Sequence, residues 1–197
     1  MKTLTYKDIK PYIESGLVNE QVLGDLRIFN YSKVCQFDRK WDDVTIQCRG
    51  LIMRGDEIVA RPFRKFFNLG EVEETKIENL PAEMPQVTEK FDGSLGILYF
   101  QPDGRPAIAT RGSFTSDQAL RATEMLRNMP PFWNNIDLNL TYLFEILYPE
   151  NRVVVNYGNR EELVLIGLVN RTTGEECTPL EVKGVADRLG LKNLCSV

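Results

Sequence analysis

Residues 89–93, Glu-Lys-Phe-Asp-Gly, hold the side chain of this sequence that is best suited to covalent chemistry. The amine of Lys90 can act as a nucleophile, and Asp92 and Gly93 follow it closely. Glycine lets a ligand approach the main chain at a point where a side chain would obstruct it. A β-turn carrying a solvated lysine fits the same residues, so the rest of the sequence has to decide between the two interpretations.

The sequence contains no histidine. This excludes Ser-His-Asp and Cys-His triads, histidine general bases and nearly every catalytic zinc site. The four cysteines show no Cys-x-x-Cys spacing and are expected to be reduced thiols. Any chemistry must therefore use Lys, Arg, Asp, Glu or Tyr side chains.

Composition predicts one globular domain over residues 1–197, because 43% of the residues are hydrophobic. No apolar run approaches the roughly 18 residues that span a membrane, and the first residues lack the apolar core of a signal peptide. We therefore expect a cytoplasmic protein that does not bind membranes. The net charge of -4 argues against a nucleic-acid binder that uses its whole surface, but it leaves local basic clusters possible.

Four basic side chains, Arg49, Lys65, Lys90 and Arg111, stand near the ends of predicted strands. Taken singly, each is more typical of a solvated surface charge. Gathered on one face, they would form a cradle for polyphosphate. Arginine is the better clamp for phosphate oxygens and lysine the better nucleophile, so the residue types fit a division of labour.

Two further features add to this group. Phe67 follows Phe66 directly after the basic cluster and one of the pair could stack on a base, although core packing is the commoner use of such residues. Glu145 lies inside the apolar run 143–147, where a carboxylate needs a partner. A ribose hydroxyl, hydrated magnesium and a structural salt bridge all satisfy that need.

Alternating and apolar runs bounded by turn residues predict a mainly antiparallel α+β fold, in which hairpins join the strands and a few helices lie at the edges. Helices are predicted over 5–23, where Pro11 should divide the helix in two, from a capping box at Thr115–Gln118 up to Pro130, and over about 179–189, where Gly190 ends the last helix. The predicted strands are 26–31, 45–53, 57–63, 87–88, 95–100, 107–110, 142–147, 152–157 and 163–169.

Five ordered blocks of the sequence resemble the phage-type ATP-dependent RNA ligases, which belong to the covalent nucleotidyltransferase superfamily. The similarity runs over roughly residues 25 to 176, and the ordered combination is far more specific than Lys-x-Asp-Gly alone. The blocks are Arg49-Gly-Leu-Ile-Met, Arg61-Pro-Phe-Arg-Lys-Phe-Phe-Asn-Leu, Lys90-Phe-Asp-Gly-Ser-Leu, Arg111-Gly-Ser-Phe-Thr-Ser-Asp-Gln-Ala-Leu, and Phe144-Glu-Ile with Pro149-Glu-Asn-Arg-Val-Val.

The resemblance implies a nucleotidyltransferase (ATP-grasp-like ligase adenylation) domain that uses ATP and Mg²⁺. Lys90 would take AMP from ATP, the AMP would pass to the 5′-phosphate of an RNA end, and a 3′-hydroxyl would displace it to seal the strand. Arg49 and Lys65 would hold ATP phosphates, Tyr31 would lie at the nucleotide, and Glu145 would be the third-motif carboxylate and a metal ligand. The resemblance also puts Phe67, Glu89, Asp92, Gly93 and Arg111 in the ATP site, with Arg111 where the family often has a lysine.

The fourth and fifth motifs of the resembled family, Glu-Gly and Lys-x-Lys, do not occur before Val197. We therefore expect an adenylation domain that is incomplete at its C-terminal side, binds ATP weakly and seals RNA poorly by itself. Lys183 and Lys192 are the nearest candidates to replace the absent lysines. The alternatives are another lysine-nucleotidylating transferase and a non-catalytic domain that binds nucleotide or RNA.

Overall fold

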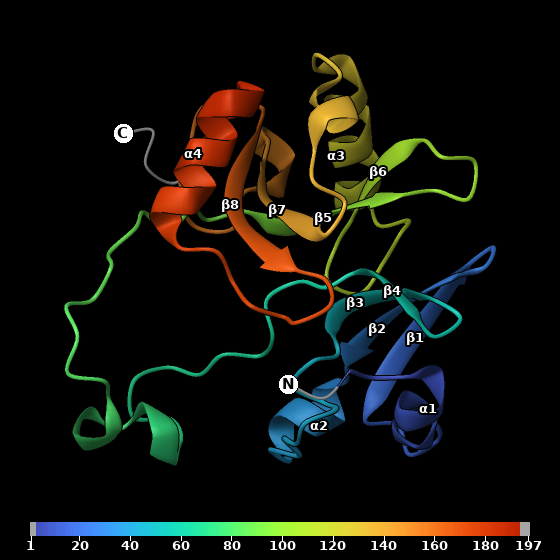
Figure 1. The fold of residues 1–197 in the computed structure, drawn as a ribbon, viewed down its shortest axis with the longest axis vertical. Helices are drawn as coiled ribbons and strands as arrows, with labels where there is room; N and C mark the ends of the chain where they lie inside the picture. Colours follow the sequence, from blue (N-terminus) through green and yellow to red (C-terminus); the bar gives the residue numbers. More distant parts are fainter. Residues whose placement is uncertain (1–2, 194–197) are drawn as a thin grey trace.

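Two four-stranded antiparallel sheets form the body of the protein in this computed structural model, which describes residues 3–193 (Figure 1). The first sheet has the order β1 (Val18–Leu23), β2 (Leu26–Tyr31), β3 (Arg49–Arg54) and β4 (Glu57–Ala60). The second has the order β6 (Pro106–Ala109), β5 (Ser94–Phe100), β7 (Leu140–Leu147) and β8 (Glu162–Asn170). The α+β class with antiparallel sheets is thus confirmed.

The helices cover the outer faces of the two sheets. Helix α1 (Tyr6–Glu14) packs on the first sheet, whereas α3 (Asp117–Asn128) and α4 (Pro179–Leu189) pack on the second (Figure 1). The other helices are α2 (Lys33–Phe37) and the 3₁₀ turns Glu73–Thr75, Ile77–Asn79, Phe132–Asn135 and Pro149–Asn151. No helix in the described part of the chain is long and apolar enough to cross a membrane.

A shared core holds the inner faces of the two sheets together. Ile28 and Ile52 from the first sheet and Ile97 and Leu143 from the second are all fully or almost fully buried in one cluster. Gly50 permits this close approach, because a Cβ atom there would lie 2.5 Å from the Ile97 side chain and 3.1 Å from the carbonyl oxygen of the residue at position 111. With a φ of +99°, position 50 also favours glycine through its backbone conformation.

Arg61 ties the first sheet to the second just after β4. Its backbone N–H donates to the hydroxyl of Thr141 at 2.8 Å, its Nη1 donates to Gln47 at 2.6 Å, and its Nε donates to the carbonyl oxygen of Arg171 at 2.8 Å. The side chain is 3% exposed. This arginine is therefore part of the framework and is not presented to a phosphate.

Residues 61–93 connect the two sheets and contain no strand. Figure 1 shows this connection leaving the body, passing through two short 3₁₀ turns and returning to β5. Residues 81–90 are exposed throughout. Lys90 therefore approaches the second sheet on an extended segment that lacks sheet partners before β5.

The N-terminal prediction is partly wrong. One helix spans Tyr6–Glu14 with Pro11 inside it, and the predicted capping box of Thr5 with Asp8 is present. The helix ends because Gly16 takes a φ of +74°, and residues 18–23 form β1 instead of continuing the helix. The turn at Gly24-Asp25, with Gly24 at φ +61°, joins β1 to β2 as a hairpin. This hairpin was not predicted, because the predicted helix extended to residue 23.

Two predicted strands, 87–88 and 152–157, are absent from the described structure. The strand that follows 87–88, β5, already pairs with β6 and β7, and the strand that precedes 152–157, β7, already pairs with β5 and β8. Neither segment can therefore form a hairpin with its neighbouring strand in the chain. Backbone N–H groups within 152–157 bond to a side chain, as described below.

The remaining differences concern the ends of elements. Residues 43–47 form a turn, in which Asp42 accepts the N–H groups of Val44 and Thr45, and β3 begins only at Arg49. Residues 61–63 follow the end of β4. Helix α3 starts one residue later than the predicted box implies, with Ser116 as the N-cap residue. Cys35, Cys48 and Cys177 are free thiols, as expected, and Cys195 lies outside the described residues.

Candidate active site

Lys90 lies at the end of the exposed connection, four residues before Ser94, where β5 begins. Its side chain is exposed to solvent. The ammonium group is close enough to Asp92 and Glu145 to act on both carboxyls: it adds to the lowering of the Asp92 pKa by backbone hydrogen bonds, and it opposes the increase that burial causes in the Glu145 pKa. Lys90 therefore stands beside two carboxylates in this conformation.

Asp92 holds the lysine loop against residues 152–158. Its carboxylate accepts the N–H groups of Val154 at 2.6 Å and Val155 at 2.7 Å, and these bonds hold the pKa of the carboxyl below its usual value. The N–H of Asp92 donates to the hydroxyl of Tyr157 at 2.9 Å. The aspartate of the Lys-x-Asp-Gly pattern is thus a structural anchor in this conformation.

Gly93 packs directly on β7. Its N–H donates to Glu145 at 2.8 Å, and a Cβ atom at this position would lie 2.4 Å from the carbonyl oxygen of Ile146. The next residue, Ser94, donates to Asn151 at 2.9 Å. Glycine is required here by contact with the neighbouring strand, in addition to any approach of a ligand.

A cavity of about 520 Å³ opens beside Gly93, between the two sheets. Arg49, at the start of β3, and Arg111, just after β6, line it together. The remaining lining residues are Asn30, Ser94, Leu95, Thr110, Gly112 and Gln118. The two arginines of the predicted cradle thus line one cavity beside the lysine loop, where guanidinium groups could meet phosphate oxygens.

Tyr31 bridges the two arginines. The guanidinium of Arg111 lies 5.4 Å from the centre of the Tyr31 ring and donates to its hydroxyl at 3.3 Å. Burial lowers the pKa of the half-buried Arg49, and the nearby Arg111 lowers it further, whereas Tyr31 and Glu145 raise it. An anionic ligand between the arginines would relieve their mutual repulsion.

Glu145 contacts Gly93, one of the residues that line this cavity. It pairs with Leu95 across β7 and β5, so its side chain is half-buried at the sheet surface. Burial raises the pKa of its carboxyl, and the bond from Gly93, Lys90 and Arg49 oppose that increase. A structural salt bridge is not needed to hold it, because the Gly93 N–H already does so.

The donor set for a metal is small. In the part of the chain that the structure describes, no group of three or more His, Cys, Asp or Glu is placed to hold a metal ion. Mg²⁺ is commonly held by one or two carboxylates together with substrate phosphates and water. Glu145 fits such a role as a single protein ligand.

Lys65 and Phe67 lie in a neighbouring pocket of about 490 Å³. The Lys65 ammonium lies 4.0 Å from the centre of the Phe67 ring and bonds to the carbonyl oxygen of Phe66. Glu89 is exposed on the connection and lines neither pocket. The structure thus brings Arg49, Arg111 and Tyr31 together, whereas Lys65 lines a separate pocket.

The two lysines proposed as replacements for absent motifs are engaged elsewhere. Lys183 pairs with Asp187 within α4, and Lys192 pairs with Glu162 at the start of β8. Helix α4 packs on the face of the second sheet that is turned away from the shared core. Neither lysine lies at the cavity in this conformation.

Sequence reasoning missed two aromatic residues of this region. Tyr157 bonds to the lysine loop, and Trp41 contacts the Tyr31 ring edge-on at 4.9 Å. Tyr157 lies three residues after the block that begins at Pro149, and an aromatic residue so close to that block was a usable signal. Trp41 stood in a polar stretch, where a large aromatic residue without an apolar pattern is itself unusual.

Comparison with known proteins agrees with this geometry. A family model described as RNA ligase matches residues 47–196. The RNA ligase of Rhodothermus phage RM378 is 27% identical over 184 residues, covering 74% of this chain and 41% of the phage protein. A curated protein of Thermovibrio ammonificans, whose name proposes an RNA ligase, is 34% identical over 121 residues, covering 59% of this chain and 31% of that protein.

The fold is shared with a solved archaeal ATP-dependent RNA ligase, with a TM-score of 0.60 at 16% identity. That match covers 95% of this chain and 48% of the archaeal chain. The present chain therefore spans less than half the length of each of these relatives. Because the family model matches well over half of its residues, the chain belongs to the RNA ligase family.

Proposed function

We propose that this chain is the nucleotide-transferring part of an ATP-dependent RNA ligase and that Lys90 carries the AMP. The observation that carries the proposal is the hydrogen bond from the N–H of Gly93 to Glu145, which fixes the lysine loop beside the cavity that contains Arg49 and Arg111. Family membership supplies the reaction class.

In the first step, the neutral amine of Lys90 attacks the α-phosphorus of ATP. A nitrogen–phosphorus bond forms, the bond between the α-phosphorus and the bridging oxygen breaks, and pyrophosphate leaves with that electron pair, while the amine loses a proton to solvent. Arg49 and Arg111 stabilise the charge that develops on the phosphate oxygens. Lys65 adds a third cation from the adjoining pocket.

Two further steps would complete sealing. The 5′-phosphate of an RNA end attacks the phosphorus of the lysine-bound AMP and releases Lys90. A 3′-hydroxyl then attacks the activated 5′-phosphate and displaces AMP. When bound, Mg²⁺ would neutralise phosphate charge, and Glu145 is the residue proposed to hold it.

The other assignments made from the resemblance stay predictions. Tyr31 and Phe67 would contact the nucleotide or orient the cations, and Asp92 and Gly93 would position the loop. Glu89 would act only if the exposed connection closes toward the cavity. The cytoplasmic location is likewise a prediction from the sequence.

Retention of radioactive AMP tests the proposal. The chain is incubated with α-labelled ATP or α-labelled GTP, denatured and separated by electrophoresis. We expect acid-labile label from ATP and none from GTP, and Lys90→Ala should abolish it while the chain stays folded, because an exposed side chain contributes little to stability. The control Lys7→Ala removes an exposed lysine on α1 and should keep the label.

Label that persists in Lys90→Ala would show that the nucleophile is misassigned. Equal label from GTP would favour a different nucleotidyltransferase. The rate of labelling also measures how far residues 1–197 act alone.

A further inference from the structure

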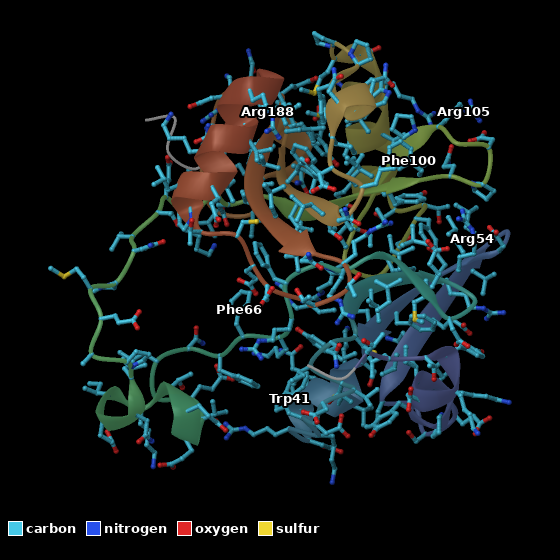
Figure 2. All side chains as sticks on the ribbon, viewed as in Figure 1. Trp41, Arg54, Phe66, Phe100, Arg105 and Arg188 are labelled. Carbon is cyan, nitrogen blue, oxygen red and sulfur yellow. The ribbon has the colours of Figure 1, made fainter. Side chains whose placement is uncertain are left out.

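The pocket that contains Lys65 has more aromatic surface than phosphate binding requires. Trp41, Phe66 and Phe67 supply its aromatic surface, and Arg64 and Lys65 supply its positive charge. Phe66 is 63% exposed, although it is a large apolar side chain. Its other lining residues are Asp42, Asp43, Ile46, Val72, Glu74 and Thr75. Figure 2 shows Trp41 and Phe66 near the point where the exposed connection leaves the body.

Ring contacts join this pocket to the candidate active site at two points. The Arg49 guanidinium, which lines the cavity beside Gly93, lies 4.9 Å from the centre of the Phe66 ring. The ring of Tyr31, which bonds to Arg111, lies 4.9 Å from that of Trp41. A strand whose end lies between the arginines could therefore place its next nucleotide in the aromatic pocket.

We propose that this pocket binds one nucleobase of single-stranded RNA beside the end that is joined, a substrate subsite that rests on the proposed ligase function. The exposed face of Phe66 would stack on the base, Trp41 would form the opposite side, and Arg64 and Lys65 would meet the adjoining phosphate. Aromatic faces next to basic side chains are the usual means of binding single-stranded nucleic acid.

Volume and charge both fit this occupant. A pocket of about 490 Å³ falls within the ordinary range for sites that hold small ligands, so it can accept a nucleoside-sized group. Phe66, which follows Arg64 and Lys65 in the chain, contacts the Arg49 guanidinium, so the phosphate end of the nucleotide would lie toward the candidate active site.

The carboxylates of the pocket set the orientation of the base. Asp42 is already bonded to Tyr12 and to the N–H groups of Val44 and Thr45, so it acts in the framework. Asp43 and Glu74 also line the pocket, where a carboxylate would repel phosphate but accept from an exocyclic amine. Adenine, cytosine and guanine carry such amines and uracil does not, so cytosine should bind more tightly than uracil.

Fluorescence of Trp41 tests the proposal directly. In the Trp133→Phe background, Trp41 is the one remaining tryptophan of the sequence. Titration with a 5′-phosphorylated single-stranded oligocytidylate should quench its emission to saturation, and oligouridylate should require a higher concentration. Phe66→Ala should weaken oligocytidylate binding roughly 5- to 150-fold, the range expected for one lost stacking contact, and Phe66→Tyr should restore it.

The matched control is Phe37→Ala, which removes another exposed phenylalanine, on α2, and should leave RNA affinity unchanged. Blunt duplex RNA should not quench Trp41, because its bases are already stacked. The thermal midpoint of each variant is measured to establish that it folds.

The outcomes separate this subsite from the ligase function. If Lys90 is labelled by ATP but Phe66→Ala binds RNA as tightly as Phe37→Ala does, the subsite is wrong and the ligase proposal stands. Quenching of Trp41 by ATP or AMP but not by RNA would assign the pocket to the mononucleotide and would also overturn the inference. Quenching by RNA without labelling of Lys90 would support the subsite and overturn the ligase proposal.

Discussion

Glu145 is the side chain on which the geometry of the lysine loop most depends. It accepts the Gly93 N–H at 2.8 Å, and burial raises the pKa of its carboxyl above the usual 4.5. The folded protein therefore binds this proton more tightly than the unfolded chain does. The stability that this group contributes is fully present below pH 4.5 and is lost as the pH rises through the folded pKa.

This predicts a measurable change in the pH dependence of stability. Glu145→Gln keeps an acceptor for the Gly93 N–H but removes the titration, so the fall in the urea midpoint as pH rises above 4.5 should become shallower. Equilibrium urea unfolding at several pH values measures it. Glu150→Gln, an exposed carboxyl just after β7, is the control. A slope unchanged by Glu145→Gln but reduced by Glu150→Gln would contradict the assignment.

The segment 152–158 acts as a support for the lysine loop. It has no regular secondary structure after the 3₁₀ turn, yet it bonds to Asp92 through two N–H groups and the hydroxyl of Tyr157. The ring of Tyr157 also lies 6.3 Å from that of the buried Phe91. These contacts hold Phe91 and Asp92, the two residues after Lys90, in place. The segment 152–158 therefore limits the positions that the Lys90 side chain can reach.

Removal of the Tyr157 hydroxyl should slow adenylation without removing ATP binding. Tyr157→Phe keeps the ring but loses the acceptor for the Asp92 N–H, a bond of about 0.5–1.5 kcal/mol. If the loss falls on loop position, labelling of Lys90 slows up to roughly tenfold.

Single-turnover labelling at several ATP concentrations separates rate from affinity. Tyr148→Phe removes a neighbouring hydroxyl outside this hydrogen bond and should label at the rate of the unaltered chain. A Tyr157→Phe chain that labels at full rate but binds ATP weakly would instead place Tyr157 at the nucleotide.

The two sheets are joined by one core, so the chain should unfold as a unit. Ile97 is fully buried between the sheets and would contact any side chain placed at Gly50. Ile97→Ala should lower the free energy of unfolding by about 2–5 kcal/mol, as expected for a cavity in a packed core.

Two tryptophans, one near each sheet, allow the unfolding of the two sheets to be followed separately. Trp41 contacts Tyr31 at the end of the first sheet, whereas Trp133 packs with Phe132 in the core between the second sheet and its helices. In single-tryptophan variants, both signals should shift together when Ile97→Ala is introduced. Two separate transitions, only one of which moves, would show that the sheets unfold independently.

Local sequence patterns predicted most of the helices and strands, because the formation of these elements depends largely on residues that are near one another in the chain. The strands that begin near residues 26, 95 and 163 and the terminal helix ended by Gly190 were all expected, and Gly190 has a φ of +68° as a helix end requires. The predicted strand over 152–157 was wrong because periodicity cannot say whether the preceding strand, β7, has an edge left for pairing. That edge is decided by pairing between strands far apart in the sequence.

The residue types of the site could likewise be chosen from the sequence. Lysine before Asp-Gly and the absence of histidine favoured an amine nucleophile, and nucleotide transfer was implied by the resemblance of the ordered blocks. Which side chains meet could not be read in this way: Arg49 and Arg111 share a cavity with Gly93, whereas Lys65 lies in the next pocket. Their meeting depends on two sheets packing closely at Gly50, and such contacts between distant residues are set by the tertiary fold, since no local pattern in the chain encodes the distance between them.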